Sequence, residues 1–317
     1  MILRRLAVSV VMLTAVSALI FVVLRLLPGD PVITRLGATP GISPATIAQL
    51  RKDAGLDDPI VVQYLSWMGG VLHGDFGRSY FNQYSVTQLI GQRLPTTIEL
   101  TILSMIIAVV LAVPAALLTA RRPGGVLDRA LTTLSSAGMA LPNFIVGVLL
   151  IVIFAVKWSV LPSRGFIPIG ESLGGNLRSM LLPSLTLAIA AAPLLLRFLR
   201  ASLLEVLTAP FIRTARGKGA SDARVLLLHA FRNALIPAVT MLGLIVGYTL
   251  GGAVIIEYIF GLPGLGSLAV DSVTKRDYAV LQSCVLLISA MFILTTLVVD
   301  IVTGILDPRL RTGRGRG

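Results

Sequence analysis

The sequence predicts an all-α protein that crosses a membrane six times with both termini in the cytoplasm. Of its 317 residues, 55% are hydrophobic and 13% are charged, whereas soluble domains carry about 25% charged residues. The apolar residues gather in six long runs, and the basic residues gather in alternate connections between those runs. A soluble globule with an ordinary solvated surface is therefore excluded.

The six runs are each long enough to span a bilayer core about 30 Å thick, which needs roughly 20 apolar residues per helix. They cover residues 6–27, 98–120, 131–156, 181–199, 236–256 and 280–306. The first run follows Arg4 and Arg5 and resembles the start of a signal peptide. Since such a peptide has an apolar stretch of about 7–15 residues and this run continues to Leu27, we expect it to stay as a helix.

The orientation follows from the distribution of lysine and arginine, which favour cytoplasmic connections. With a cytoplasmic N-terminus, 16 of the 27 basic residues lie inside, where the net charge is +11 against +1 outside. Membrane topology and anionic lipid account for the total charge of +12. We therefore expect membrane lipid as a partner of this charge, and no nucleic acid.

The remaining segments divide the chain into four parts. Residues 1–27 form the first spanning helix, 28–95 an extracytoplasmic segment with short helices, 96–308 a five-helix core, and 309–317 a basic tail. In the outer segment, Pro44 and Pro59 begin short helices, since proline suits the start of a helix. The second of these helices has an apolar face, which fits either a helix in the membrane interface or a small folded cap over the bundle.

Motifs for enzymatic chemistry are missing from the sequence. A P-loop needs G-x-x-x-x-G-K-[ST], but around the single Gly-Lys pair, Gly217-Lys218, Ile212 and Gly219 occupy the first glycine and the hydroxyl positions. Cys284 is the one cysteine, and His73 and His229 fall on opposite sides of the membrane. We predict no enzyme, no cofactor and no metal site in this chain.

A basic, glycine-broken loop at about 200–235 stands out between the fourth and fifth runs. A helix over 199–216 should extend past the membrane, Gly217 and Gly219 should end it, and Ser221 should cap a second helix over 223–235. Two helices that meet at a glycine turn make a rigid knob that projects from the bundle. An ordinary helical hairpin with positive-inside arginines is the alternative.

This loop, Arg213-Thr214-Ala215-Arg216-Gly217-Lys218-Gly219 with Pro237 downstream, resembles the cytoplasmic "EAA" loop of ABC-importer permeases of the peptide/nickel group. Arg213 stands where the broad family has an acidic residue. Further patches with the same resemblance are Arg25–Pro31, Gly55-Leu56-Asp57, Gln63-Tyr64, Gly74–Ser79, Glu257–Gly266, Asp277-Tyr278 and Asp307-Pro308-Arg309.

The resemblance implies the type I importer permease fold and a permease subunit that moves di- or oligopeptides across the bacterial cytoplasmic membrane. It implies a second homologous permease, an extracytoplasmic binding protein and two ATP-binding subunits, which would hold ATP and Mg²⁺. The residues expected at the ATPase contact are Arg213, Thr214, Ala215, Arg216, Gly217, Lys218 and Gly219. A related importer for nickel, haem or another solute is an alternative, as is a stand-alone secondary transporter, which would show paired intramembrane charges or inverted repeats.

Two sets of residues inside the runs are candidates for packing and for the translocation path. Gly243, Gly247 and Gly251 repeat at four-residue spacing, which lets helices approach closely in lipid, either within the chain or at a seam with a partner permease. Asn143, Glu257 and Asp300 are polar residues in apolar runs, where charge is costly. They either line the path or serve the structure, and Glu257 is expected near a solvated helix end.

Overall fold

The structure, a computed structural model, describes residues 2–26, 43–53 and 55–306. Within these residues the framework is helical, with one isolated antiparallel bridge between Arg78 and Ser85. The helices are α1 Ile2–Leu26, α3 Pro44–Asp53, α4 Ile60–Leu72, α5 Val86–Arg121, α6 Val126–Ala140, α7 Asn143–Leu150, the π-helix η1 Ile151–Lys157, α8 Leu173–Leu207, α9 Pro210–Gly217, α10 Asp222–Arg224, the π-helix η2 Val225–Ala230, α11 Phe231–Phe260, α12 Leu265–Thr274 and α13 Tyr278–Leu306. The predicted tail 309–317 lies outside the described residues.

Five of the six predicted spans are helices long and apolar enough to cross a membrane. They are Arg4–Leu26, Val86–Arg121, Leu173–Leu207, Asp222–Phe260 and Tyr278–Ile305. The all-α fold is therefore confirmed, and each of these helices overlaps one of the predicted apolar runs.

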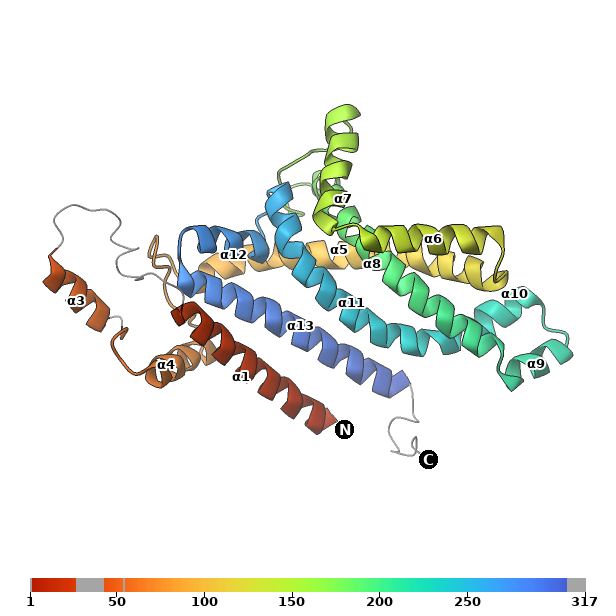
Figure 1. Cartoon of the computed structure of the whole chain (residues 1–317), viewed down its shortest axis with the longest axis horizontal. Coiled ribbons are helices and arrows are strands. Elements are labelled where there is room, and N and C mark those ends of the chain that lie inside the picture. Colours follow the sequence, from red (N-terminus) through yellow and green to blue (C-terminus); the bar gives the residue numbers. More distant parts are fainter. Residues whose placement is uncertain (1, 27–42, 54, 307–317) are drawn as a thin grey trace.

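The predicted third span, 131–156, is not one straight helix. It is divided between α6 and the α7–η1 segment, which are bent by 102° relative to each other. Leu141 at the bend has an extended backbone (φ −88°, ψ 127°), because the following Pro142 disfavours the helical conformation in the residue before it. Proline also lacks the N–H that would continue the helix, so α7 leaves the bundle at a steep angle (Figure 1). The chain has six spans only if this bent pair counts as one.

Helix α8 lies at the centre of the bundle and packs against α5, α6, α7 and α11. Its contact with α5 uses alanines: Ala188 and Ala191 of α8 lie with Ala108 and Ala112 of α5 in one buried cluster. Small side chains let two helix backbones approach closely where lipid supplies no hydrophobic driving force. The alanines of α8 thus help to explain why this helix, and not a terminal one, lies at the centre.

The N-terminal helix α1 lies on the outside of the bundle, against α13. Helix α4 is fastened to α1 by aromatic contacts, with the Phe21 ring 5.5 Å from Tyr64 and 5.8 Å from Trp67 between centroids. The hydroxyls of Ser17 and Tyr64 are 2.9 Å apart and share a hydrogen bond. Since Val61, Leu65 and Leu72 of α4 remain exposed, the helix fits the expectation of an apolar face in the membrane interface.

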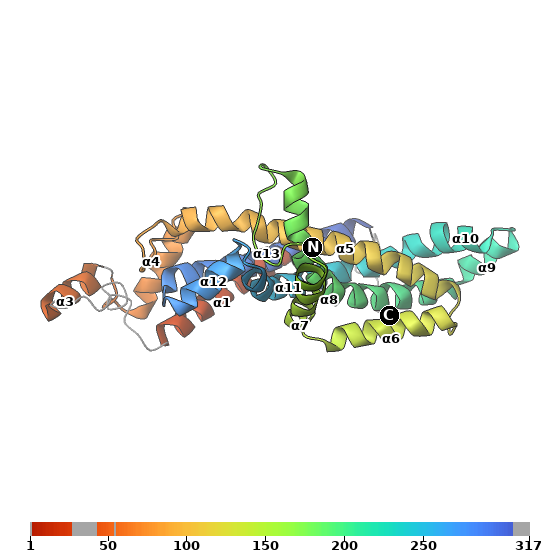
Figure 2. The same cartoon turned by 90° about the horizontal axis from the view of Figure 1, so that it is seen from above.

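The elements divide between the two ends of an elongated molecule (Figures 1 and 2). Helices α9 and α10 form one end, and α3, α4 and the start of α5 lie toward the opposite end. The beginning of α1 and the end of α13 point toward the α9–α10 end (Figure 1). This arrangement is compatible with the predicted topology, in which both termini and the basic loop share the cytoplasmic side.

Candidate coupling elbow and translocation face

The basic loop begins with a corner that the sequence analysis missed. Instead of one helix over 199–216, α8 ends at Leu207 and α9 begins at Pro210. Ala209 between them is extended (φ −64°, ψ 147°), which is the conformation favoured before a proline. Pro210 occupies the first turn of α9, where no N–H is needed. We call residues 210–224 the elbow.

The end of α9 is a complete glycine cap. Gly219 has φ +83°, and its N–H donates to the Arg216 carbonyl at 2.9 Å, while the Ala220 N–H donates to the Ala215 carbonyl at 3.1 Å. These two bonds form a Schellman motif, which satisfies the last carbonyls of a helix. Ser221 then accepts a bond from the Arg224 N–H at 3.4 Å and begins α10, so the glycine and the cap act as the sequence predicts.

One buried side chain anchors the elbow to the bundle. Ile212 is fully buried in a cluster with Leu199 and Leu203 of α8, Val225 of η2 and alanines of α5 and α11. Ala215, one turn later, is half-buried and packs against the same cluster. The elbow is therefore packed against three helices of the bundle, α5, α8 and α11.

The predicted contact residues form the free side of the elbow. Arg213, Thr214, Arg216, Gly217, Lys218 and Gly219 are exposed. Arg216 makes an exposed ion pair with Asp222, with 3.5 Å between Nε and Oδ1, and such a pair contributes little stability. Arg213 and Lys218 make no hydrogen bond or ion pair with any described residue. The result is a cationic surface whose charges are available to a partner.

Phe211 is a surface residue that the sequence analysis did not select. Its side chain is 46% exposed on α9, one residue before the buried Ile212. A large exposed aromatic beside cations is typical of protein interfaces. Its hydrophobicity alone gave no signal, because apolar residues are common throughout this chain.

The three spaced glycines of α11 do not share one role. A Cβ on Gly247 would overlap the Phe292 ring of α13, and a Cβ on Gly243 would lie 3.1 Å from Val299 Cβ. These two glycines therefore serve packing within the chain. Gly251, by contrast, has open space beside it, so only this glycine is left for a seam with a partner.

The three polar path candidates occupy different environments. Asp300 pairs with Arg5 of α1 at 3.0 Å and so fastens α1 to α13. Asn143 is half-buried, and its amide nitrogen would lie 3.0 Å from a Cβ built on Gly252 of α11. Asn143 thus lies beside α11 at the point where α7 leaves the bundle. Asp300 makes a structural contact, its ion pair with Arg5.

Glu257 is not at a solvated helix end, which corrects the expectation for this residue. It is fully buried, and its carboxylate accepts bonds from Thr97 Oγ1 (2.6 Å), the Gly266 N–H (2.7 Å) and the Ser267 N–H (3.1 Å). The last two donors belong to the first turn of α12, where a negative charge is stabilised. A Cβ on Gly264 would overlap this carboxylate, so the Glu257–Gly266 patch is a single folded turn.

A second carboxylate, that of Asp277, joins two more of the sequence patches. Asp277 is 4% exposed and accepts bonds from Ser79 Oγ and, at 3.0 Å, from the Tyr80 N–H. The segments Gly74–Ser79 and Asp277-Tyr278 are distant in the sequence, but they meet at this carboxylate. We call the Glu257 turn and the Asp277 junction together the outer turns.

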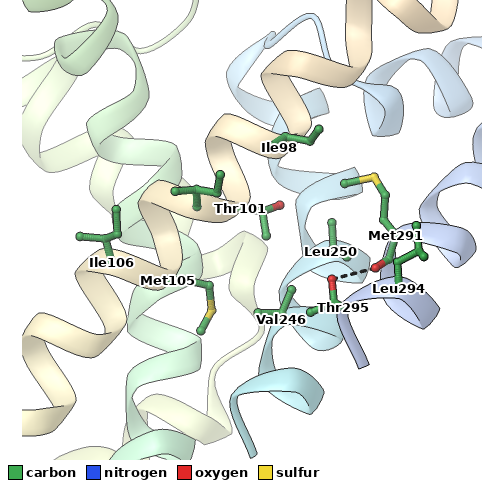
Figure 3. A pocket seen from close by; sticks show the side chains of 10 residues that line it. Ile98, Thr101, Met105, Ile106, Val246, Leu250, Met291, Leu294 and Thr295 are labelled. Atoms are coloured by element: carbon green, nitrogen blue, oxygen red, sulfur yellow. Dashed lines mark hydrogen bonds between the residues drawn. The ribbon is translucent and has the colours of Figure 1, made fainter. Parts of the chain in front are cut away.

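An apolar cavity of about 460 Å³ lies between α5, α11 and α13. Figure 3 shows side chains from these helices around it, among them Ile98, Met105, Leu250 and Met291. The polar groups in its wall are the hydroxyls of Thr101 and Thr295, which donate to backbone carbonyls within their own helices. The cavity therefore presents no charged group to a peptide.

Comparisons with known proteins cover almost the whole chain. Residues 112–312 match the family of binding-protein-dependent transport system inner membrane components, and residues 1–101 match the N-terminal component of the same systems. A probable peptide ABC transporter permease of Sinorhizobium fredii is 39% identical over 310 residues, covering 98% of each chain. The oligopeptide transport permease AppB of Bacillus subtilis is 38% identical, and the glutathione transport permease GsiC of Salmonella typhi is 42% identical, each with 98% of both chains covered.

The fold also occurs in a solved structure. The chain resembles the MetNI methionine ABC transporter in its inward-facing conformations, with a TM-score of 0.59, 19% identity, and coverage of 69% of this chain and 97% of that one. At this identity the likeness concerns the fold alone. The family match over most of the length and the 39% identity to a curated permease show that the chain belongs to the inner membrane components of binding-protein-dependent transport systems, the multi-pass permease subunits of ABC importers.

Proposed function

We propose that the chain is a permease subunit of an ATP-driven importer that carries di- and oligopeptides across the bacterial cytoplasmic membrane. The observation that supports it most is the similarity over 98% of the chain to relatives named for peptide, oligopeptide and glutathione transport. The family match implies ATP-binding and substrate-binding partners, and it leaves a stand-alone secondary transporter without support.

The assembly that we propose contains a second homologous permease, two ATP-binding subunits and an extracytoplasmic binding protein. ATP and Mg²⁺ would bind to the ATP-binding subunits and not to this chain. One face of α11 suits contact with the second permease, because it is exposed along its length and includes the open glycine. Its residues are Leu244, Tyr248, Gly251, Ile255 and Tyr258. Asn143 lies near the same helix and remains the candidate for the path.

Uptake by the reconstituted complex tests this function. The chain would be co-expressed with the proposed second permease, ATP-binding subunits and binding protein, and placed in proteoliposomes. We expect uptake of labelled di- and tripeptides that requires both ATP and the binding protein. Uptake of nickel or haem in place of peptides would contradict the substrate, and ion-driven uptake by the chain alone would contradict the mechanism.

We propose that the elbow transmits the movement of the ATPases to the bundle. Its exposed cations offer a docking surface, and the buried Ile212 connects that surface to α5, α8 and α11. When the ATPases close on ATP, the elbow and its attached helices would move together. The bundle would then face outward and receive peptide from the docked binding protein, as expected for a two-state system biased by a ligand.

Charge reversal at the elbow tests the coupling. Arg213→Glu should lower peptide import per ATP hydrolysed and weaken co-purification of the ATPases, because a carboxylate replaces a free cation at the contact. Arg122→Glu, an exposed arginine in the turn between α5 and α6, is the matched control and should have a smaller effect. Normal import by the Arg213 variant would refute the proposed contact.

A further inference from the structure

A cavity of about 410 Å³ lies beside the end of α11, away from the elbow. Its walls come from the start of α5, the segment before α8, the turn after α11 and α12. The polar side chains in these walls belong to Arg93, Arg164, Tyr258, Ser267 and Asp271. Its volume is in the range of small-molecule sites, which hold about 300–1,000 Å³.

The cavity contains charges of both signs that the described residues do not neutralise. Arg164 Nε donates to the Ile259 carbonyl at 3.1 Å, and its two terminal nitrogens make no hydrogen bond within the described chain. The Asp271 carboxylate is exposed and has no hydrogen-bond or ion-pair partner there. Arg164 and Asp271 line the same cavity but do not pair with each other. A cavity that carries two separate opposite charges is complementary to a zwitterion.

The wall that carries these charges is fixed before any ligand arrives. Ser267 is held by the buried Glu257 carboxylate, which also holds the first turn of the helix that carries Asp271. The Gly165 N–H, next to Arg164, donates to the Phe260 carbonyl at 3.2 Å. Charges on a preorganised frame bind a ligand at low entropic cost.

We propose that this cavity receives the charged ends of the transported peptide. The Arg164 guanidinium, with Arg93 beside it in the wall, binds the α-carboxylate, for which arginine offers two parallel donors. Asp271 binds the α-ammonium group. Tyr258 lines the cavity and also belongs to the exposed face of α11, so the cavity lies beside the proposed seam with the second permease. The inference rests on the proposed function as a peptide importer.

The test measures import of dialanine by the complete transporter in proteoliposomes, with binding protein saturated by the probe. Asp271→Asn and Arg164→Ala should each lower import about tenfold, because each removes one charge-assisted contact. Binding-protein-stimulated ATP hydrolysis should stay within about twofold of the wild type, since the coupling surface is untouched. Import of C-amidated dialanine should fall little in the Arg164→Ala variant, because this peptide has no carboxylate for the arginine to bind.

Two matched controls lie on the same side of the molecule but outside the cavity. Glu171→Gln removes an exposed carboxylate. Arg178→Ala removes a guanidinium that, like Arg164, donates to one backbone carbonyl, that of Val160 at 3.0 Å. Both controls should import dialanine at the wild-type rate.

Four results would overturn the proposal. Unchanged dialanine import by the cavity variants would show that the cavity does not receive substrate. A parallel loss of import and stimulated ATP hydrolysis would show that these residues dock the binding protein instead. An equal loss for the amide would refute the role of Arg164. Failure of the wild-type complex to import any peptide would refute the proposed function, and this inference with it.

Discussion

The elbow and the outer turns use charge in opposite ways. At the outer turns, Glu257 and Asp277 are buried, and each carboxylate accepts bonds from segments distant in the sequence. At the elbow, Arg213 and Lys218 are exposed and have no partner among the described residues. The two carboxylates of the outer turns are therefore satisfied within the chain, whereas these two cations of the elbow are not.

A sequence patch can therefore stand out for two different physical reasons. The Glu257–Gly266 patch is conspicuous because a buried carboxylate needs donors and close glycines, so its chemistry is complete within the chain. The patch at Arg213–Gly219 is conspicuous because two of its cations, Arg213 and Lys218, have no partner among the described residues. Substitutions at the outer turns should therefore affect folding first, and those at the elbow should affect coupling first.

The largest effect should come from Glu257→Ala. The change leaves Thr97 Oγ1 and the N–H groups of Gly266 and Ser267 buried without their acceptor, and each unsatisfied donor costs about 1–3 kcal/mol. We expect loss of several degrees in the melting temperature of the purified complex and a smaller monodisperse fraction. Glu257→Gln, which keeps an acceptor oxygen, should fall between this variant and the wild type. If Glu257→Ala kept the wild-type melting temperature, the buried carboxylate would not be needed for folding, and the contrast between the outer turns and the elbow would be refuted.

Ile212→Ala tests the anchor of the elbow and should have the second largest effect. Truncation of a buried isoleucine costs about 2–5 kcal/mol, and Ile212→Val should cost about 0.5–1.5 kcal/mol. Because the elbow then moves independently of the bundle, import per ATP hydrolysed should fall in the order wild type, valine, alanine. Phe211→Ala, its exposed neighbour, should leave the melting temperature unchanged and weaken ATPase co-purification. Tight coupling in Ile212→Ala would show that the anchor is elsewhere.

Leucine substitutions at the glycines of α11 should have a smaller effect on stability. Gly247→Leu should destabilise the chain by about 1–3 kcal/mol through overpacking against Phe292, and Phe292→Ala should partly rescue it. Gly251→Leu has open space and should leave the chain folded. If the exposed face of α11 is the seam, Gly251→Leu should reduce co-purification of the second permease. Equal melting temperatures for the two leucine variants would refute the packing role of Gly247.

Apolar runs and glycine signals were sufficient to predict most of the fold. Five spans lie where the runs place them, and Gly219 and Ser221 end and begin helices as predicted, because these signals act locally. The run 131–156 was predicted as one span because it stays apolar through Leu141-Pro142, although a proline disfavours the helical conformation in the residue before it. The corner at Ala209-Pro210 was missed because 199–216 was predicted as one helix, although the same restriction applies before Pro210.

The environments of the polar residues depend on contacts that sequence spacing does not show. Glu257 appears as a charge near a helix end, but its burial depends on Thr97, 160 positions away. Likewise, Asp300 is matched by Arg5 only because α1 lies against α13. The cavity that Arg164 and Asp271 line could not be predicted from the sequence for the same reason, since its walls come from four separate segments.

The smallest effect concerns the turn that shapes the elbow. Gly219→Ala meets no steric contact, so its cost comes from φ +83° alone and should be about 1 kcal/mol. Gly217→Ala, two residues earlier and within α9, is the matched control and should stabilise the helix slightly, because alanine is the better helix former. Hydrogen–deuterium exchange of the elbow should therefore be about fivefold faster in Gly219→Ala, since local opening becomes that much easier, and no faster in Gly217→Ala. Equal exchange in the two variants would mean that the Schellman turn does not hold the elbow in shape. The buried Ile212 would then be the residue that fixes the elbow to the bundle.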